Sequence, residues 1–279
     1  MRQSSPRQLE RPVTADKARQ ALEDGLVVAW RNLKRVPRIP ELAVFAILQS
    51  IMFVLLFAYV FGGAIPLPGG ASYREYLMPG IFAQTIVFAT ATTAIGMTDD
   101  LSKGILDRFR SLPMARSAVL SGRTLSDVVY NGGILIVLML SGLAVGWRVH
   151  SGVLEFLAGV GLLLLFAFVM SWIGVWLGLT LRTVEVTQQV SFTVLFPLTF
   201  LSNVFVPTQS LPWWLRPVAE WNPVSALTAA TRHLWGNPNP FAASGLPAEH
   251  PIELTLAWVV VLLAIFAPLG VWRYRSMSR

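Results

Sequence analysis

The sequence predicts an all-α polytopic membrane protein with six transmembrane helices. Of its 279 residues, 54% are hydrophobic and 13% are charged, whereas a soluble domain carries about 25% charged residues. A soluble fold of this size needs more polar surface, so lipid must cover much of the outside. Stretches without Asp, Glu, Lys or Arg recur along the chain, and several reach the roughly 20 residues that a helix needs to cross a bilayer.

Each expected span is the apolar part of one charge-free stretch. The six spans are 42–61, 80–97, 128–147, 156–181, 186–206 and 254–272. The second is the least apolar because it is rich in Thr, Ala and Gln, so we expect it to face protein or a transport path rather than lipid. The spans form a transmembrane domain at 41–273, between a cytoplasmic N-terminus at 1–40 and a cytoplasmic tail at 274–279.

The basic residues set the expected orientation. Eighteen of the 22 Lys and Arg residues fall in the N-terminus, the second and fourth inter-span loops and the tail. The opposite loops hold only Arg74, Arg148, Arg216 and Arg232. Lys and Arg collect on the cytoplasmic side of membrane proteins, so both termini are expected in the cytoplasm. The net charge of +7 therefore indicates membrane lipid rather than nucleic acid as a partner.

Residues 16–36 have the pattern of an amphipathic helix. Apolar side chains recur near helical spacing, and Trp30 lies beside Arg31 and Lys34, as expected at the headgroup boundary. Pro37 and Pro40 then separate this helix from the first span. Two interpretations remain open: an interfacial anchor, or a docking surface for a cytoplasmic partner.

The cytoplasmic loop at 99–123 has the pattern of a second short helix. Its apolar stripe consists of Leu101, Ile105, Leu106, Phe109 and Leu112. Asp99 and Asp100 are expected at the start of this helix, where the helix dipole favours acids, and Pro113 is expected to end it. Such a helix either docks into a groove on a partner or forms a solvated linker on the membrane.

The last external loop, 207–253, is rich in proline and holds four of the ten tryptophans: Trp213, Trp214, Trp221 and Trp235. One interpretation is an aromatic belt at the outer interface. The other is a set of re-entrant-type external helices before the last span, which could form a lid over an export path. The sequence favours neither interpretation over the other.

Several kinds of chemistry have no motif in the sequence. There is no cysteine and no Gly-x-x-x-x-Gly-Lys-Ser/Thr phosphate-binding loop. The three histidines lack metal-ligand spacing, so we expect no cofactor or metal on this chain. Asp127, Glu155 and Glu185 lie at the edges of spans rather than at their centres, which disfavours transport coupled to an ion gradient. The pairs Gly142/Gly146 and Gly174/Gly178 fit the Gly-x-x-x-Gly pattern, for packing within the chain or between copies.

Three further motifs stand out: Asp-Arg-Phe-Arg-Ser-Leu-Pro-Met-Ala-Arg at 107–116, Phe-Leu-Ser-Asn-Val-Phe-Val-Pro at 200–207 and Trp-Asn-Pro-Val at 221–224. They resemble those of the type-2 ABC exporter permeases, in particular their daunorubicin-resistance branch. The resemblance implies a coupling helix at about 100–113 that fits a cleft on a separate nucleotide-binding ATPase subunit, which would bind ATP and Mg. Permeases of this family often have an acid four residues before the glycine of this loop, and here Asp100 precedes Gly104. The implied coupling residues are Asp100, Lys103, Gly104, Asp107, Arg108, Phe109, Arg110 and Pro113.

The resemblance also implies that two six-span units pair around a central path, as a homodimer or with a related permease. Spans two and five would line this path in the cytoplasmic (inner) membrane of a bacterium. The candidate path residues are Phe82, Gln84, Phe88, Phe192, Phe196, Phe200 and Asn203. Aromatic rings with a few amides suit a bulky amphipathic drug, antibiotic or lipid, although each phenylalanine could instead only pack against its neighbours.

The function expected from these observations is the permease subunit of an ATP-driven exporter that has no ATPase of its own. The alternatives are a membrane-embedded lipid-modifying enzyme and a non-transporting scaffold. An enzyme needs polar or acidic catalytic residues that converge at a membrane boundary, and the sequence shows no such cluster. Movement of a substrate that depends on ATP separates the permease from both alternatives.

Overall fold

The computed structural model describes residues 48–49, 51–61, 72–105, 116–205, 208, 211–239 and 245–277, which form helices and connecting turns without any strand. An apolar helix over Ile51–Val60 ends in a π-helical turn, η2 (Phe57–Phe61). The long helices are α3 (Tyr73–Ser102), α5 (Arg116–Val145), α6 (Val153–Thr180), α7 (Val184–Phe200) and α11 (Pro251–Ser276). The short helices are α8 (Arg216–Glu220), α9 (Pro223–Leu234) and α10 (Leu246–Glu249). The all-α prediction is confirmed for this part of the chain.

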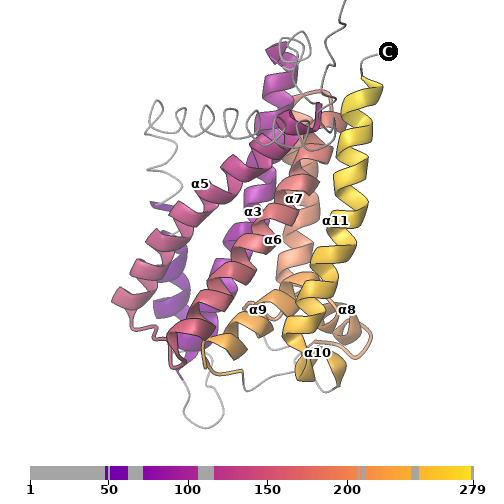
Figure 1. Cartoon of the computed structure of the whole chain (residues 1–279). Coiled ribbons are helices and arrows are strands. Elements are labelled where there is room, and N and C mark those ends of the chain that lie inside the picture. The colour runs from indigo at the N-terminus through magenta and orange to yellow at the C-terminus, as the bar shows by residue number, and fades with distance from the viewer. Residues whose placement is uncertain are drawn as a thin grey trace, which may run out of the picture.

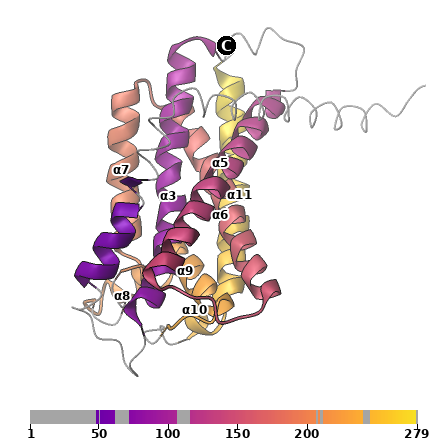
Figure 2. The same ribbon diagram turned by 90° about the vertical axis from the view of Figure 1, so that its left-hand side faces the viewer.

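The long helices run side by side as a bundle with two distinct ends (Figure 1). We call one the loop end, where α3 stops, α5 begins and α11 reaches the C-terminus. We call the other the cap end, where α8, α9 and α10 lie (Figures 1 and 2). α3 and α6 pack on each other, α7 packs on α3, and α11 packs on α6 and α9.

Among the described residues, four helices are long and apolar enough to cross a membrane, namely α3, residues Leu120–Val145 of α5, α6 and α11. They coincide with the second, third, fourth and sixth expected spans. The expected first span coincides with the shorter apolar helix Ile51–Val60, and the expected fifth with the 17 residues of α7. α3 and α5 extend beyond the predicted spans. The predicted spans were limited to residues without charge, whereas the end turns of these helices include charged residues such as Arg74 and Asp100 of α3.

α3 is the most enclosed of the four long apolar helices. Of its most apolar 18-residue window, 67% is buried within the protein, against 17% for α11. The prediction that the second span faces protein is therefore confirmed. Gly174 of α6 makes this contact possible, because a Cβ atom there would lie 2.7 Å from the carbonyl oxygen of Thr90. Gly178 is closed in by Ala94 and Met97 in the same way, so this Gly-x-x-x-Gly pair packs α6 on α3.

The cap end is built around α9, in which every residue from Val224 to Arg232 is buried. Asn222 caps its N-terminus by accepting a hydrogen bond from the Val224 backbone N–H. The loop before α11 thus contains short helices, as one interpretation of the sequence expects. Of its tryptophans, Trp235 is buried, while Trp213, Trp214 and Trp221 remain exposed, as the aromatic-belt interpretation requires. The predicted amphipathic helix at 16–36 lies outside the described residues.

Candidate functional site

At the loop end, Asp99 and Asp100 lie in the last turn of α3. The prediction that they begin a separate helix is wrong, because α3 continues without interruption to Ser102. Acids at a helix C-terminus oppose the helix dipole, but each carboxylate here pairs with a cation. Lys103 Nζ lies 2.7 Å from Asp99 Oδ2. Gly104 follows with a φ of 65°, the left-handed conformation that glycine adopts readily after a helix. Of the other implied coupling residues, Asp107, Arg108, Phe109, Arg110 and Pro113 lie outside the described residues.

Asp100 belongs to a mostly buried ion network that joins the two helices flanking the 99–123 loop. Arg123 Nη1 of α5 lies 3.2 Å from Asp100 Oδ2 of α3, and Arg123 Nε lies 3.3 Å from Asp127 Oδ1. The Thr93 hydroxyl donates to Asp127 Oδ2 over 2.8 Å. We call Thr93, Asp100, Arg123 and Asp127 the loop-end clamp, because they hold both ends of the loop at a fixed separation.

Four of the candidate path phenylalanines lie together, three of them on the exposed side of α7 and the fourth, Phe88, on the neighbouring helix α3. Phe196 is the centre of the group, with ring centroids 5.4 Å from Phe88, 6.1 Å from Phe192 and 5.4 Å from Phe200. Phe192, Phe196 and Phe200 are 37%, 48% and 49% exposed. Core phenylalanines are usually enclosed, so this group presents an accessible aromatic surface.

The row of rings continues into two residues that the sequence analysis did not select. Phe205 lies 5.3 Å from Phe200 and 4.4 Å from Phe57, measured between ring centroids. We call Phe57, Phe88, Phe192, Phe196, Phe200 and Phe205 the aromatic ladder. The sequence shows that Phe53 and Phe57 are spaced by four residues, as on one face of a helix. It does not show that Phe57 contacts Phe205, which lies almost 150 residues later in the chain.

Two candidate path residues lie elsewhere. Phe82 is fully buried and packs edge-on against Trp147 and Trp235, at 5.2 and 5.8 Å between ring centroids. It is thus part of the apolar core at the cap end. Gln84 is also buried. Phe82 lies six residues before Phe88 on α3 and projects from another side of that helix. Gln84 lies four residues before Phe88, on nearly the same side, but it is enclosed within the bundle rather than accessible like the rings of α7.

Arg232 of α9 is the most unusual side chain at the cap end, since it is charged and 0% exposed. Its Nε donates to the carbonyl oxygen of Tyr76 over 2.8 Å, and its Nη2 donates to those of Asn203 and Val204 over 3.1 and 3.3 Å. The guanidinium carbon also lies 3.6 Å from the centre of the Tyr76 ring, a cation–π contact. Burial lowers the pKa of the Arg232 guanidinium, and its contacts with Tyr76 and Tyr73 raise it. Its ordinary pKa is high enough that it stays charged.

The carbonyls of residues 203–205, in the turn after α7, accept hydrogen bonds from Arg232 and from two tyrosine hydroxyls of α3. The Tyr76 hydroxyl donates to Asn203 O over 2.9 Å, and the Tyr73 hydroxyl donates to Phe205 O over 3.3 Å. We call Tyr73, Tyr76, Arg232 and the 203–205 turn the Arg232 anchor. The anchor ties α7 and the aromatic ladder to α3 and α9.

Arg232 lies in the expected external segment 207–253, but it is buried on α9 rather than exposed in a loop. Its neighbours in the sequence, from Ser225 to Thr231, are almost all small, and small residues allow close packing on every side of a helix. An arginine beside a run of small residues therefore indicates a buried side chain, and a count of charged residues per loop does not detect this pattern.

No metal centre is indicated in the described ranges. They contain no group of three or more His, Cys, Asp or Glu side chains that could hold a metal ion.

Comparison with known proteins gives consistent results over nearly the whole chain. A family model described as ABC-2 type transporter matches residues 24–234. The chain is 32% identical over 269 residues to a daunorubicin resistance ABC transporter permease protein of Streptomyces coeruleorubidus, covering 96% of this chain and 90% of that protein. It is 24% identical over 268 residues to a probable doxorubicin resistance ABC transporter permease protein of Mycobacterium tuberculosis, covering 96% and 94%. A second doxorubicin resistance permease of that organism is 27% identical over 208 residues, covering 71% and 70%.

Replacing Arg232 by lysine tests the anchor. Lysine keeps the charge but lacks the planar fork that reaches three carbonyls at once. We expect the thermal unfolding midpoint in detergent to fall by about 5–10 °C, since several charge-assisted hydrogen bonds are lost from a buried site. Arg148→Lys is the matched control, because Arg148 also donates to two carbonyls, those of Leu143 and Trp147, but is exposed. Equal small shifts in both variants would contradict the anchor.

Proposed function

The chain belongs to the ABC-2 type transporter family, and we propose that it is the membrane-spanning permease subunit of an ATP-driven exporter of amphipathic drugs or antibiotics. The observation that carries this proposal is the match to drug-resistance permeases over 96% of the chain, in a protein with four helices long and apolar enough to cross a membrane. Lipids remain a second class of cargo, because an accessible row of aromatic rings suits an acyl chain as well as a fused-ring drug.

A separate subunit supplies the ATPase in this proposal. The sequence contains no phosphate-binding loop of the Gly-x-x-x-x-Gly-Lys-Ser/Thr type, and ABC transporters are defined by ATP hydrolysis. ATP and Mg would bind to that partner subunit, and this chain would hold no cofactor. Its own task is to provide the path across the membrane and to convert the partner's movement into a change of that path.

The proposed topology has six spans, with the loop end in the cytoplasm of a bacterial cell and the cap end outside. The two spans beyond the four long apolar helices would be Ile51–Val60 with preceding residues, and α7 with the turn that follows it. The uneven distribution of Lys and Arg supports this orientation. The cap helices α8, α9 and α10 would then cover the outer ends of the spans.

The loop-end clamp is the proposed route by which the ATPase acts on the spans. The segment around Asp107–Arg110 would contact the ATPase. Asp100 would act within the chain, since its carboxylate is buried against Arg123. Because the ion network joins the helices at the two ends of the loop, a force on the loop would move α3 and α5 together rather than bend the loop alone.

A second permease is the proposed partner for the exposed side of α7. Beside the ladder, α7 exposes the polar side chains of Gln188, Gln189 and Thr193. Amide and hydroxyl groups are disfavoured against lipid tails, so another protein surface or a water-filled path would cover this side. The relatives include two different permeases from one organism, which favours a related permease as strongly as a second copy.

The alternative of a membrane-embedded lipid-modifying enzyme has no observation in its favour. The acidic cluster at a span boundary in the described residues is the loop-end clamp, and its carboxylates are paired with Arg123.

Purification in mild detergent from the native membrane, followed by mass spectrometry, tests the proposed partners. We expect an ATPase with a phosphate-binding loop to accompany the chain in stoichiometric amounts. The complex should then move daunorubicin into inside-out vesicles when ATP is present, and not when ATP is replaced by a non-hydrolysable analogue. A chain that purifies alone and transports nothing with any co-expressed ATPase would overturn the proposal.

Asp100→Asn tests the clamp in the same vesicles. Because a buried arginine loses one of its carboxylates, we expect export to fall about tenfold while ATP hydrolysis changes by less than about twofold, an uncoupled phenotype. The control is Asp99→Asn, since Asp99 belongs to the same helical turn but its pair with Lys103 is exposed and contributes little. If hydrolysis and export fall in proportion in Asp100→Asn, the clamp has only a structural role.

Phe196→Ala tests the aromatic ladder. Phe196 contacts three other rings, and each aromatic contact contributes about 0.5–1.5 kcal/mol. We therefore expect the ratio of kcat/KM for two different drugs to change by about three- to tenfold, with normal abundance in the membrane. Trp272→Ala is the control, since Trp272 is an exposed aromatic residue of α11 outside the ladder. A loss of abundance without a change in the ratio would mean that Phe196 only packs.

A further inference from the structure

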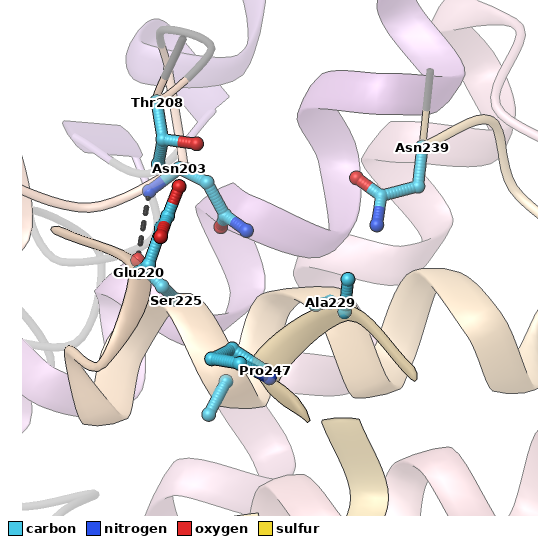
Figure 3. Close-up of a pocket in the computed structure, with 9 residues that line it drawn as sticks. Asn203, Thr208, Glu220, Ser225, Ala229, Asn239 and Pro247 are labelled. Atoms are coloured by element: carbon cyan, nitrogen blue, oxygen red, sulfur yellow. Dashed lines mark hydrogen bonds between the residues drawn. The ribbon is translucent and has the colours of Figure 1, made fainter. Parts of the chain in front are cut away.

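A polar pocket opens at the cap end, between the turn after α7 and the short helices α8, α9 and α10 (Figure 3). The space between its lining residues is about 290 Å³ in total, much of it open to solvent, and the enclosed part has room for only one small group. Its polar lining consists of Asn203, Thr208, Glu220, Ser225 and Asn239, and small apolar residues of α9 and α10 complete the wall. Figure 3 shows the side chains of Asn203 and Thr208 on one side of the pocket and Asn239 facing them from the other.

Two oxygen atoms of this pocket are buried and have no hydrogen-bond partner, namely Asn203 Oδ1 and Thr208 Oγ1. Thr208 is only 2% exposed. Unpaired buried polar atoms are rare in native proteins, because each costs about 1–3 kcal/mol unless something binds to it. Ser225 Oγ differs from them because it already accepts a hydrogen bond from the Asn203 backbone N–H at 3.0 Å.

Glu220 gives the pocket its charge. It is half-buried at the end of α8, and its carboxylate forms no ion pair or hydrogen bond with the described part of the chain. One carboxylate, one amide oxygen and one hydroxyl oxygen are therefore available as acceptors around the same space. This arrangement favours a cation that donates hydrogen bonds and disfavours an anion.

The number and type of these oxygens favour an ammonium group over a metal ion. An alkylammonium has three N–H donors, so Glu220, Asn203 and Thr208 can accept one hydrogen bond each. Ca²⁺ takes about six to eight oxygen ligands, usually with several carboxylates, and Mg²⁺ requires a near-octahedral set. A single carboxylate with two neutral oxygens provides too few ligands and too little charge for either metal.

The pocket also lies at one end of the aromatic ladder. Asn203 belongs to the short turn that joins Phe200 to Phe205, both members of the ladder. A molecule with its apolar rings against the ladder could therefore place a polar group near Asn203 without crossing the bundle. The Arg232 anchor fixes this turn through the Asn203 backbone oxygen, which leaves the Asn203 side chain directed to the pocket (Figure 3).

We propose that this pocket binds the protonated amine of the exported molecule at the outer end of its path, through Glu220, Asn203 and Thr208. The inference rests on the proposed export function and narrows its substrate class to amphipathic amines. Glu220 supplies the opposite charge, and the two neutral oxygens accept the remaining N–H groups. Removing the charge of the ligand or that of Glu220 has the same consequence, because either change leaves only neutral hydrogen bonds.

The test compares a primary amine with its neutral derivative. ATP-driven uptake of daunorubicin and of N-acetyldaunorubicin is measured in inside-out vesicles containing the permease–ATPase complex, with wild-type or Glu220→Gln permease. We expect Glu220→Gln to raise the KM for daunorubicin about tenfold, the change that follows from losing one charge-assisted hydrogen bond. The KM for the acetylated compound and both kcat values should stay unchanged. Glu249→Gln is the matched control, since Glu249 is an exposed acid of α10 that does not line the pocket.

Three results would overturn the proposal. An equal change for both compounds would show that Glu220 has a structural role, and no change for either would show that the pocket takes no part in export. If EDTA reproduces the effect of Glu220→Gln in wild-type vesicles, the bound cation is a metal ion.

Failure of the proposed export function would give a different result, because the wild-type complex would then move neither compound with ATP. The pocket is still tested in that case by binding of daunorubicin to the purified full-length chain, followed by its fluorescence. Wild-type and Glu249→Gln proteins should bind with equal Kd, and Glu220→Gln about tenfold more weakly. Equal binding by all three would overturn the proposal.

Discussion

The buried guanidinium of Arg232 is the interaction on which the cap end depends. A turn that is buried within a bundle leaves its carbonyls without regular backbone partners, and little water is available there to replace them. α7 ends at Phe200, and the turn that follows would present the carbonyls of residues 203–205 to an apolar interior. Arg232 and two tyrosines of α3 satisfy these carbonyls. Only arginine combines a permanent charge with donors fixed in one plane, so one side chain joins three segments.

The anchor makes α7 part of the same mechanical unit as α3. At the cap end α7 is held through the 203–205 turn, and near its other end the Thr187 and Thr98 hydroxyls are 2.9 Å apart. Thr98 also donates to the carbonyl of Gly178 over 3.0 Å, which brings α6 into the contact. Packed helices with fixed hydrogen bonds shift as bodies rather than bending locally. Under the proposed function, a displacement of α3 at the loop-end clamp would therefore carry α7 and the aromatic ladder with it.

The sequence predicts the class of fold well and the local roles of residues less well. Charge-free stretches locate the four long apolar helices, since exclusion of charge from lipid is a strong and local constraint. The same rule misplaces the ends of α3, where Asp100 is paired rather than excluded. It also assigns Arg232 to a loop, because counting charges takes no account of the carbonyls that surround this residue. The four-residue spacing of Phe192, Phe196 and Phe200 predicts that they share one face of a helix. Phe82 is separated from them because it packs against Trp147 and Trp235, a long-range contact that helical periodicity cannot predict.

The least apolar of the four long apolar helices is the most enclosed. The most apolar window of α3 has the lowest mean hydropathy, 1.4, and the largest buried share, whereas that of α11 has a mean hydropathy of 2.5 and the smallest buried share. A soluble protein shows the opposite trend, since its surrounding solvent is water rather than lipid. α7 departs from the trend in the bundle, because it exposes Gln188, Gln189 and Thr193 together with the ladder. A helix that is both polar and exposed is stable in a membrane only if something other than lipid covers it. Under the proposed function, the second permease covers this surface of α7.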